Sequence, residues 1–220
     1  MKRSVDRILT THTGSLPRPR SLLEPLHAKD SGQAFDRATL EGEVRSAVGD
    51  VVRRQTELAI DIVNDGEYSK SSFATYANSR IGGLQVDNRP PRHIGRPTKD
   101  SLAFPEVYEE MKVMFAARMQ HAGRLPDSHS MICTGPIEYI GHDDVRGDIA
   151  NLETAVNGLD VTEAFITAIS PTNLEMYFKN EYYTTDEEYL AALCEAMNEE
   201  YRMIVEAGFV QGPKRVVLRP

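Results

Sequence analysis

The sequence has 220 residues, 40% of them hydrophobic and 26% charged, and its formal net charge is -8. This size and balance are typical of one soluble globular domain with a sizeable core. The acidic charge argues against nucleic-acid partners and against anionic membranes, because both attract proteins through a positive field.

The cysteines, Cys133 and Cys194, are far apart in the chain. A disulfide framework in a secreted protein normally uses more cysteines at closer spacing. The N-terminal residues are polar, and no stretch approaches the roughly 18 apolar residues of a membrane span. The sequence therefore predicts a cytoplasmic protein with free thiols and no membrane partner.

The first third of the chain predicts a strand, a helix and a second strand. Residues 7–11 are apolar and β-branched, and the glycine and prolines of 14–19 must turn the chain after them. Residues 36–59 repeat apolar side chains at helical spacing. That apolar stripe consists of Leu40, Val44, Ala47, Val48, Val51 and Val52. The second strand, at 58–63, ends in residues 64–67, and such strand ends are where α/β folds bind ligands.

The middle of the chain is the least regular part. Helices are predicted over about 69–81 and 105–120, and residues 85–104 carry several prolines and a local excess of positive charge. We expect about residues 84–130 to be an excursion outside the main domain. Its second helix could cap the site, contact another subunit or be a solvated surface helix, and the sequence leaves these interpretations open.

The second half predicts three more strands and two helices. The strands are expected at 131–136, at 164–169 and from 209 onward, and the helices at 148–157 and 185–207. Thr185 and Glu188 form a capping box at the start of the last helix, and Gly208 ends it. This alternation of strand and helix predicts a parallel sheet with right-handed crossovers.

Both a (β/α)₈ barrel and an open doubly wound sheet fit this alternation. The absence of GxGxxG and GxxxxGK[ST] after any strand weighs against the nucleotide-binding open sheets. A (β/α)₈ barrel typically needs about 250 residues, whereas residues 1–210 predict four units and the start of a fifth, and 211–220 form a divergent basic tail. We therefore expect an incomplete barrel. It would either pair with a second copy as a homo-oligomer or be a truncated product, such as a frameshift would leave.

Four motifs, in this order, resemble the catalytic barrel of cobalamin-independent methionine synthase and its shorter bacterial relatives. They are Thr10-Thr11-His12-Thr13-Gly14-Ser15-Leu16-Pro17-Arg18-Pro19, Val63-Asn64-Asp65-Gly66-Glu67, Cys133-Thr134-Gly135-Pro136 and the helix-to-strand segment 199–210. The resemblance implies an α/β fold, a TIM (β/α)₈-type barrel of the methionine synthase and uroporphyrinogen decarboxylase kind. This chain would hold about four to five of its β/α units.

The resemblance also implies an activity and its site. A methyl group would pass from 5-methyltetrahydrofolate, as its polyglutamate, to homocysteine. Zinc would activate the thiol, because the thiolate is the nucleophile and zinc keeps a bound thiol deprotonated. Ser15 would hold the carboxylate of the amino acid and Glu67 its ammonium group, with His12 and Asp65 as neighbours. No catalytic residue of this chain is assigned.

The chain departs from the family pattern where the metal site should be. The family's fifth strand continues into a Gln-Ile-Asp-Glu-Pro type segment, and here Gln211-Gly212-Pro213 follows instead. The family's zinc ligands include a His-x-Cys pair, which this sequence lacks. We therefore expect this chain to bind no zinc and to transfer little or no methyl. Two alternatives stay open: a non-catalytic fragment or dimerising scaffold, and a zinc-dependent alkyl transferase that acts on a different thiol.

Each candidate residue also has an ordinary structural interpretation. Glu67 could be a loop carboxylate, Ser15 a turn residue and His12 a side chain bonded to backbone. His129 and Cys133 would share one face of a strand, but two ligands do not make a zinc site, and Cys133 is expected to be a small buried residue. Cys194 lies on an apolar helix stripe and is expected in the core.

Overall fold

The computed structural model describes residues 2, 4–12, 14–30, 32–87, 99–121 and 130–214. They form two compact units, of which one combines Met1–Gln85 with Met131–Pro220 and the other is Val86–Ser130. The helices are α1 (Arg20–Asp30), α2 (Arg37–Glu57), the 3₁₀ helix η1 (Thr75–Ser79), α3 (Lys99–Ala103), α4 (Pro105–His121), α5 (His142–Val156), α6 (Pro171–Tyr177) and α7 (Asp186–Glu206). The strands are β1 (Ile62–Asn64), β2 (Leu84–Asp87), β3 (Ser130–Cys133), β4 (Glu163–Ile169), β5 (Phe178–Asn180) and β6 (Val210–Lys214).

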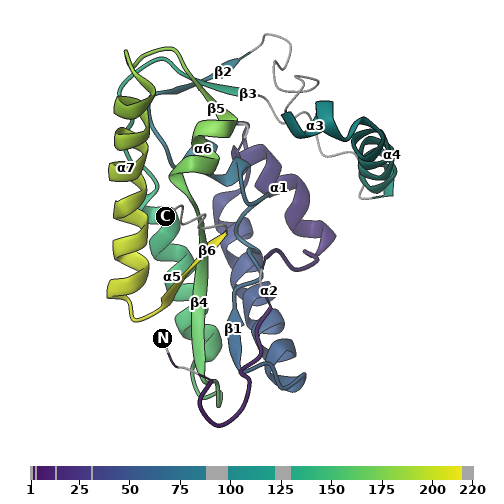
Figure 1. The fold of residues 1–220 in the computed structure, drawn as a ribbon. Coiled ribbons are helices and arrows are strands. Elements are labelled where there is room, and N and C mark those ends of the chain that lie inside the picture. Colours follow the sequence, from purple (N-terminus) through teal and green to yellow (C-terminus); the bar gives the residue numbers. More distant parts are fainter. Residues whose placement is uncertain are drawn as a thin grey trace. The chain divides into compact units, whose positions relative to one another are not determined.

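The main sheet is parallel, and its strands follow one another in chain order. β4 lies between β1 and β6 and pairs with both (Figure 1). Beyond β1, Thr11 forms an isolated parallel bridge with Ile62. The order Thr11, β1, β4, β6 contains no reversal. A doubly wound sheet would show a reversal at its switch point.

Each long helix of this unit packs against the strand that follows it. α2 contacts β1, α5 contacts β4, α7 contacts β6, and α5 also contacts both other helices (Figure 1). The predicted apolar stripe of α2 is buried throughout, and burial contributes on the order of 1.5–3 kcal/mol per large apolar side chain. α7 begins at the predicted capping box, in which Glu188 N–H donates to Thr185 Oγ1 at 3.1 Å. α2 and α7 therefore form where the sequence predicts them, whereas α5, expected at 148–157, begins already at His142.

A second small sheet has the order β2-β3-β5, with β3 parallel to β5. The segment 131–136 was expected as the third strand of the barrel, and that prediction is wrong. The place beside β1 belongs to β4, and β3 pairs with β5 instead. The N–H groups of Thr134 and Gly135 both donate to the Gly83 carbonyl, at 3.0 and 3.2 Å. An apolar run bounded by Gly-Pro predicts a strand, but it does not say which sheet the strand joins.

Other boundaries also differ from the prediction. Of the strand expected at 7–11 only the bridge at Thr11 forms, because the Thr10 N–H donates to the Asp61 carboxylate at 2.8 Å. The helix expected at 69–81 is the short η1. β6 continues to Lys214, so that four residues of the expected tail extend the strand. The sequence did not predict α1, α3, α6, β2 or β5.

The second unit contains α3 and α4. The helix expected at 105–120 is α4, whose bounds are Pro105–His121. Apolar side chains of this unit are exposed to solvent; they are Leu102, Phe104, Val107, Met111, Val113 and Met114. Over residues 105–114, where the structure describes the side chains, the helical spacing of the sequence is present without a buried face.

Candidate functional site

The turn after β1 carries two of the predicted site residues, Asp65 and Glu67. Gly66 and Glu67 both have positive φ, 65° and 59°, and this left-handed conformation costs a non-glycine residue about 1–2 kcal/mol. Side chains hold the turn: Gly66 N–H donates to Asn64 Oδ1 at 2.8 Å, and Glu67 N–H donates to Asp65 Oδ1 at 2.9 Å. The turn thus fixes the backbone of Glu67 and, with it, the direction in which its side chain points.

The loop that contains Ser15 is fastened to this turn. Leu16 N–H donates to the Gly66 carbonyl at 3.1 Å. Asn64 Nδ2 donates to the His12 carbonyl at 2.6 Å. Two segments about fifty residues apart in sequence therefore meet at the carboxyl ends of adjacent chain segments in the main sheet, where parallel α/β sheets place their ligands.

Three other side chains contact Glu67. Together with it they form what we call the Glu67 cluster: Ser15, Arg18, Glu67 and Thr167. Ser15 Oγ donates to one carboxylate oxygen at 2.5 Å, and Thr167 Oγ1 donates to the other at 2.8 Å. Arg18 Nε donates to the Glu67 backbone carbonyl at 3.1 Å. Glu67 is only 1% exposed, whereas Ser15 is exposed. The cluster therefore places a buried carboxylate beside an exposed serine.

A buried cation lies next to this cluster. The Lys70 ammonium, 1% exposed, donates to the Thr167 carbonyl and lies 4.8 Å from the centre of the Tyr76 ring. Burial raises the pKa of the Asp65 carboxyl above its ordinary value, and the positive charge of Lys70 partly opposes that shift. Thr167 therefore links the two charges, with its hydroxyl on Glu67 and its carbonyl on Lys70.

The predicted site residues divide into two groups. Ser15 and Glu67 contact each other directly. The Asp65 carboxylate stays inside the turn, and His12 uses its backbone carbonyl to anchor Asn64. The sequence reasoning missed Arg18 and Thr167. A threonine within the apolar run of β4, and an arginine between two prolines, were the available signals.

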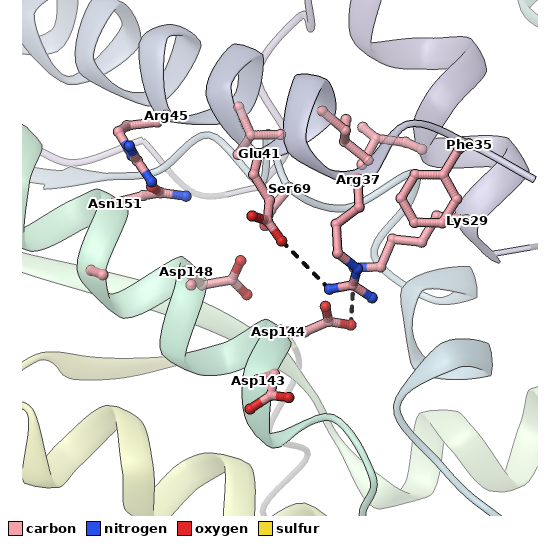
Figure 2. Close-up of a pocket in the computed structure, with 15 residues that line it drawn as sticks. Lys29, Phe35, Arg37, Glu41, Arg45, Ser69, Asp143, Asp144, Asp148 and Asn151 are labelled. Atoms are coloured by element: carbon pink, nitrogen blue, oxygen red, sulfur yellow. Dashed lines mark hydrogen bonds and ion pairs between the residues drawn. The ribbon is translucent and has the colours of Figure 1, made fainter.

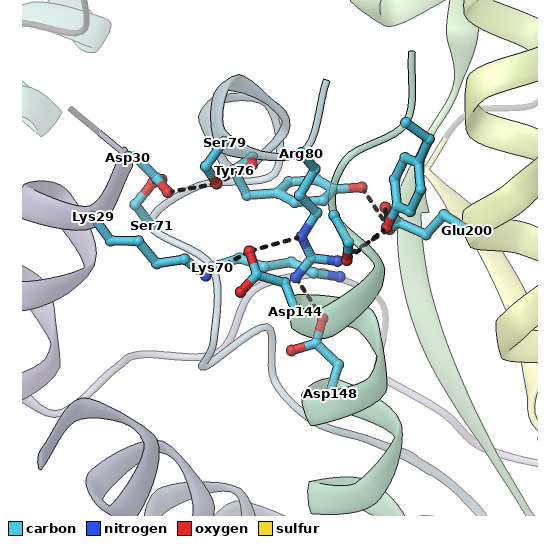
Figure 3. A network of polar contacts seen from close by, with 12 residues as sticks. Lys29, Asp30, Lys70, Ser71, Tyr76, Ser79, Arg80, Asp144, Asp148 and Glu200 are labelled. Carbon is cyan, nitrogen blue, oxygen red and sulfur yellow. Dashed lines mark hydrogen bonds and ion pairs between the residues drawn. The ribbon is translucent and has the colours of Figure 1, made fainter. Parts of the chain in front are cut away.

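A second polar cluster lies between η1, α5 and α7, and we call it the Arg80 cluster: Tyr76, Arg80, Tyr139, Asp148 and Glu200 (Figure 3). Arg80 Nη2 donates to Asp148 at 2.6 Å and Nη1 lies 3.4 Å from Glu200. Glu200 also accepts from the hydroxyls of Tyr76, at 3.1 Å, and Tyr139, at 2.8 Å. All five residues are buried. Burial opposes the charge of Arg80, but its two carboxylate neighbours outweigh that effect and raise its pKa.

A pocket of about 270 Å³ lies elsewhere, among α1, α2 and α5 (Figure 2). Two pairs of charged residues line it: Lys29 contacts Asp144 at 2.9 Å, and Arg37 contacts Glu41 at 3.5 Å. Asp148 of the Arg80 cluster also lines it. None of the predicted site residues lines it. The contacts at the strand ends, rather than this outer pocket, bring the predicted residues together.

Comparison with known families shows the family to which the chain belongs. Residues 8–169 match the family described as the cobalamin-independent synthase catalytic domain. This chain belongs to that family. The match includes the Ser15 loop, the Glu67 turn and all of β4, so every residue of the Glu67 cluster lies within it.

Individual methionine synthases also resemble this chain in sequence or in fold. The methionine synthase of Sulfolobus acidocaldarius is 25% identical over 199 residues, which cover 90% of this chain and 48% of that protein. A B12-independent methionine synthase from Shewanella sp. W3-18-1, solved in complex with selenomethionine, superposes with a TM-score of 0.61 at 19% identity. The superposition covers 91% of this chain and 49% of the Shewanella protein. A Listeria monocytogenes structure assigned to the same class gives 0.57 at 18% identity, with 93% of this chain and 51% of that one covered. This chain therefore shares their fold and spans about half their length.

The zinc that the resemblance implies has no fitting set of ligands among the described residues of this family member. No three His, Cys, Asp or Glu side chains in that part of the chain gather as a metal site would require. Cys133 is fully buried, with its Sγ 3.3 Å from the Gly135 carbonyl, and His129 lies outside the described residues. Cys194, expected in the core, is exposed. We derive no chemical step through zinc from these residues.

None of the helices in the described ranges is both long enough and apolar enough to cross a membrane.

Proposed function

We propose that the Glu67 cluster binds the amino-acid end of a sulfur-containing amino acid, as part of methyl transfer from 5-methyltetrahydrofolate polyglutamate to homocysteine. Glu67 would hold the ammonium group and Ser15 the carboxylate. The observation that carries the proposal is the contact of these two side chains at the ends of parallel strands. The protein acts in the cytoplasm on small molecules, and the family's larger fold, a (β/α)₈ barrel, provides the frame.

Two findings support the frame and the ligand. The sequential order of parallel strands, with each helix packed on the strand that follows it, is the arrangement of a (β/α) barrel. The Shewanella relative holds selenomethionine, a close analogue of the reaction product methionine. The Glu67 carboxylate accepts hydrogen bonds from Ser15 and Thr167, and a carboxylate is the group that suits an ammonium ligand.

The chemistry of the transfer sets the requirements that the site must meet. The thiolate of homocysteine attacks the methyl carbon, forms the new S–C bond and leaves the bonding electron pair on the folate nitrogen. Zinc, when bound, would supply a stabilised thiolate at neutral pH. The part assigned to this chain's described residues is to hold the amino acid, and so to fix where its sulfur points.

Isothermal titration of the full chain with L-methionine, L-selenomethionine and L-homocysteine tests this function. We expect all three to bind, and Glu67→Gln to weaken binding by on the order of 10-fold or more, because a charge-assisted hydrogen bond is lost. Glu57→Gln is the matched control, since Glu57 is an exposed carboxylate that pairs with Arg54 at 3.2 Å. No heat of binding from the wild-type chain, or equal affinity in Glu67→Gln, would contradict the proposal.

Turnover is a separate readout. Methionine formation from homocysteine and 5-methyltetrahydrofolate is measured with and without added zinc. Because the sequence has no His-x-Cys pair, we expect the chain to bind the amino acid and to show little turnover. Turnover that depends on zinc would place metal ligands in this chain and overturn that part of the expectation.

A further inference from the structure

A groove between α2 and α5 lies away from the Glu67 cluster, toward the other end of the main sheet. Its volume is about 260 Å³. The lining residues that matter here are Arg45, Gly49, Arg53, Asn151 and Asn157. Asn157 follows the last turn of α5 and precedes β4, so this groove lies toward the amino ends of the parallel strands. The Glu67 cluster lies at their carboxyl ends, and the two sites are therefore separate.

The lining of the α2–α5 groove is positively charged, although the net charge of the chain is -8. Arg45 and Arg53 supply two guanidinium groups, and none of the described residues that line the groove is an aspartate or a glutamate. Asn151 and Asn157 add neutral amides from α5 and its C-terminal cap. Arg45 and Asn151 also line the neighbouring pocket and lie together at one end of it (Figure 2). The groove thus offers hydrogen-bond donors from two helices.

Arg45 differs from the other arginines of α2 in its surroundings. Arg37, Arg53 and Arg54 each pair with a carboxylate three or four positions away on the same helix. Glu41 is four positions before Arg45, but it pairs with Arg37 at 3.5 Å. Among the described residues, no ion pair or hydrogen bond engages the Arg45 side chain. An exposed guanidinium without a carboxylate partner, beside a cavity, is well placed to bind an oxyanion through its fork of N–H donors.

We propose that the α2–α5 groove binds the phosphate group of a small phosphorylated molecule. Arg45 and Arg53 are eight positions apart, which is about 12 Å along the helix axis. Gly49 lies midway and carries no side chain, so the two guanidinium groups can approach one ligand over it. The pair of Arg53 with Asp50 is exposed on both sides, and such pairs contribute little, so Arg53 is available to a ligand.

The chemistry of the groove favours phosphate over other anions. Two guanidinium groups match the double charge of a phosphate or diphosphate, whereas a carboxylate brings one charge and two oxygens. The negative end of the α5 dipole lies nearby, so the attraction must come from the arginines of α2. The volume is slightly below the roughly 300–1,000 Å³ of drug-sized ligand sites, which suits a small molecule. The acidic net charge of the chain argues against nucleic acid as the source of the phosphate.

Equilibrium dialysis of the full chain against radiolabelled inorganic pyrophosphate tests this inference, at constant ionic strength and without divalent cations. We expect a Kd on the order of 0.1–1 mM. Arg45→Gln should weaken binding by about 10-fold or more, because it removes a charge-assisted contact. Arg54→Gln is the matched control, since it removes the same charge from the same helix and Arg54 does not line the groove. It should change the affinity by less than about 2-fold.

A second pair of variants tests the space rather than the charge. Gly49→Leu fills the gap between the arginines, and we expect it to lower the affinity by about 10-fold or more. A Cβ at Gly49 would meet no atom within 4 Å, and leucine favours a helix more than glycine does, so this variant should fold. Gly42→Leu is the control, because Gly42 has the same free space on α2 and does not line the groove.

Three results would overturn the inference. The first is no bound pyrophosphate up to about 10 mM. The second is an equal loss of affinity in Arg45→Gln and Arg54→Gln, which would mean diffuse attraction to the helix. The third is unchanged affinity in Gly49→Leu, which would place the anion elsewhere. Circular dichroism and urea unfolding confirm that each variant is folded, and none of these results bears on the Glu67 cluster.

Discussion

The Glu67 cluster and the Arg80 cluster are both buried groups of charged side chains in the same unit, yet they differ in what they leave open. In the Arg80 cluster each carboxylate lies against the guanidinium, and two tyrosine hydroxyls donate hydrogen bonds to Glu200. Each guanidinium has one buried nitrogen without a hydrogen bond among the described residues, Nη1 of Arg80 and Nη2 of Arg18. The Glu67 cluster differs in having an exposed member, Ser15. Burial of charge is therefore common to both clusters, and the exposed Ser15 distinguishes the Glu67 cluster.

The backbone conformation also differs between the two clusters. Glu67 has a φ of 59°, a left-handed conformation that is uncommon for a residue other than glycine. Arg80 has a φ of -110° as the residue that ends η1, which is ordinary for any side chain. The Arg80 cluster connects η1, α5 and α7, and its tyrosine Tyr76 also accepts the Ile169 N–H at 3.0 Å. Its geometry serves to lock the helices onto the end of β4.

The largest expected effect tests the structural role of the Arg80 cluster. Arg80→Met leaves Asp148 and Glu200 as buried carboxylates without their cation, so we expect a loss of about 3–5 kcal/mol in the free energy of unfolding. Urea unfolding followed by circular dichroism measures it. Arg54→Met, at an exposed arginine paired with Glu57, should change stability by less than about 1 kcal/mol. A loss at Arg80 as small as that at Arg54 would mean that the cluster is not a structural lock.

Sequence alone could predict the elements of this fold better than the clusters. The stripe of α2, the capping box of α7 and the apolar run of β4 are local signals, and each element forms where its signal lies. The sheet that β3 joins is not a local property, because its partner β5 lies more than forty residues further along the chain. The sequence did not indicate a role for Arg80 for the same reason, since its hydrogen-bond partner Asp148 is 68 positions away.

The same contrast applies to the candidate site. Ser15 and Glu67 were predicted because they end strands and match family motifs, and the structure brings them together. Thr167 contacts Glu67 from a position 100 residues later in the chain, and no spacing rule reaches that far. Arg18 stood in the quoted motif, but its unused donor is a feature of packing and could only be seen in three dimensions.

The second prediction concerns Asp30, which lies at the edge of the Arg80 cluster (Figure 3). Its hydrogen-bond donors are the neutral hydroxyls of Ser71 and Ser79, and burial raises its pKa from 3.8 to about 6. The folded state therefore binds this proton more tightly than the unfolded state does. The resulting stability is fully present below about pH 4 and is lost as the pH rises through about 6.

Asp30→Asn removes this titration and so isolates it. We expect the wild type to lose about 2–3 kcal/mol relative to Asp30→Asn between pH 4 and pH 7.5, measured by urea unfolding at intervals of one pH unit. Glu41→Gln, at an exposed carboxylate, should give parallel curves. A constant difference between wild type and Asp30→Asn would show that the carboxyl stays ionised, and the Arg80 cluster would then extend its charge compensation to Asp30.

The smallest expected effect separates the two clusters most directly. Thr167→Val keeps the shape of the side chain and removes one hydroxyl from Glu67, and Tyr139→Phe does the same to Glu200. Each should cost about 1 kcal/mol in unfolding free energy. Only Thr167→Val should also weaken methionine binding, by about 5- to 10-fold, because Glu67 loses the bond that orients its second oxygen. Thr167→Ser should restore the affinity.

If Tyr139→Phe weakened methionine binding as much as Thr167→Val, the two clusters would act as one continuous unit. Lys70 is the group that could join them, since it bonds to the Thr167 carbonyl and lies over the ring of Tyr76. The physical argument favours separate roles. A neutral carbonyl contact passes on little of a change at Glu200, whereas the hydroxyl of Thr167 contacts the Glu67 carboxylate itself. Equal stability losses with unequal losses of affinity are therefore the expected result.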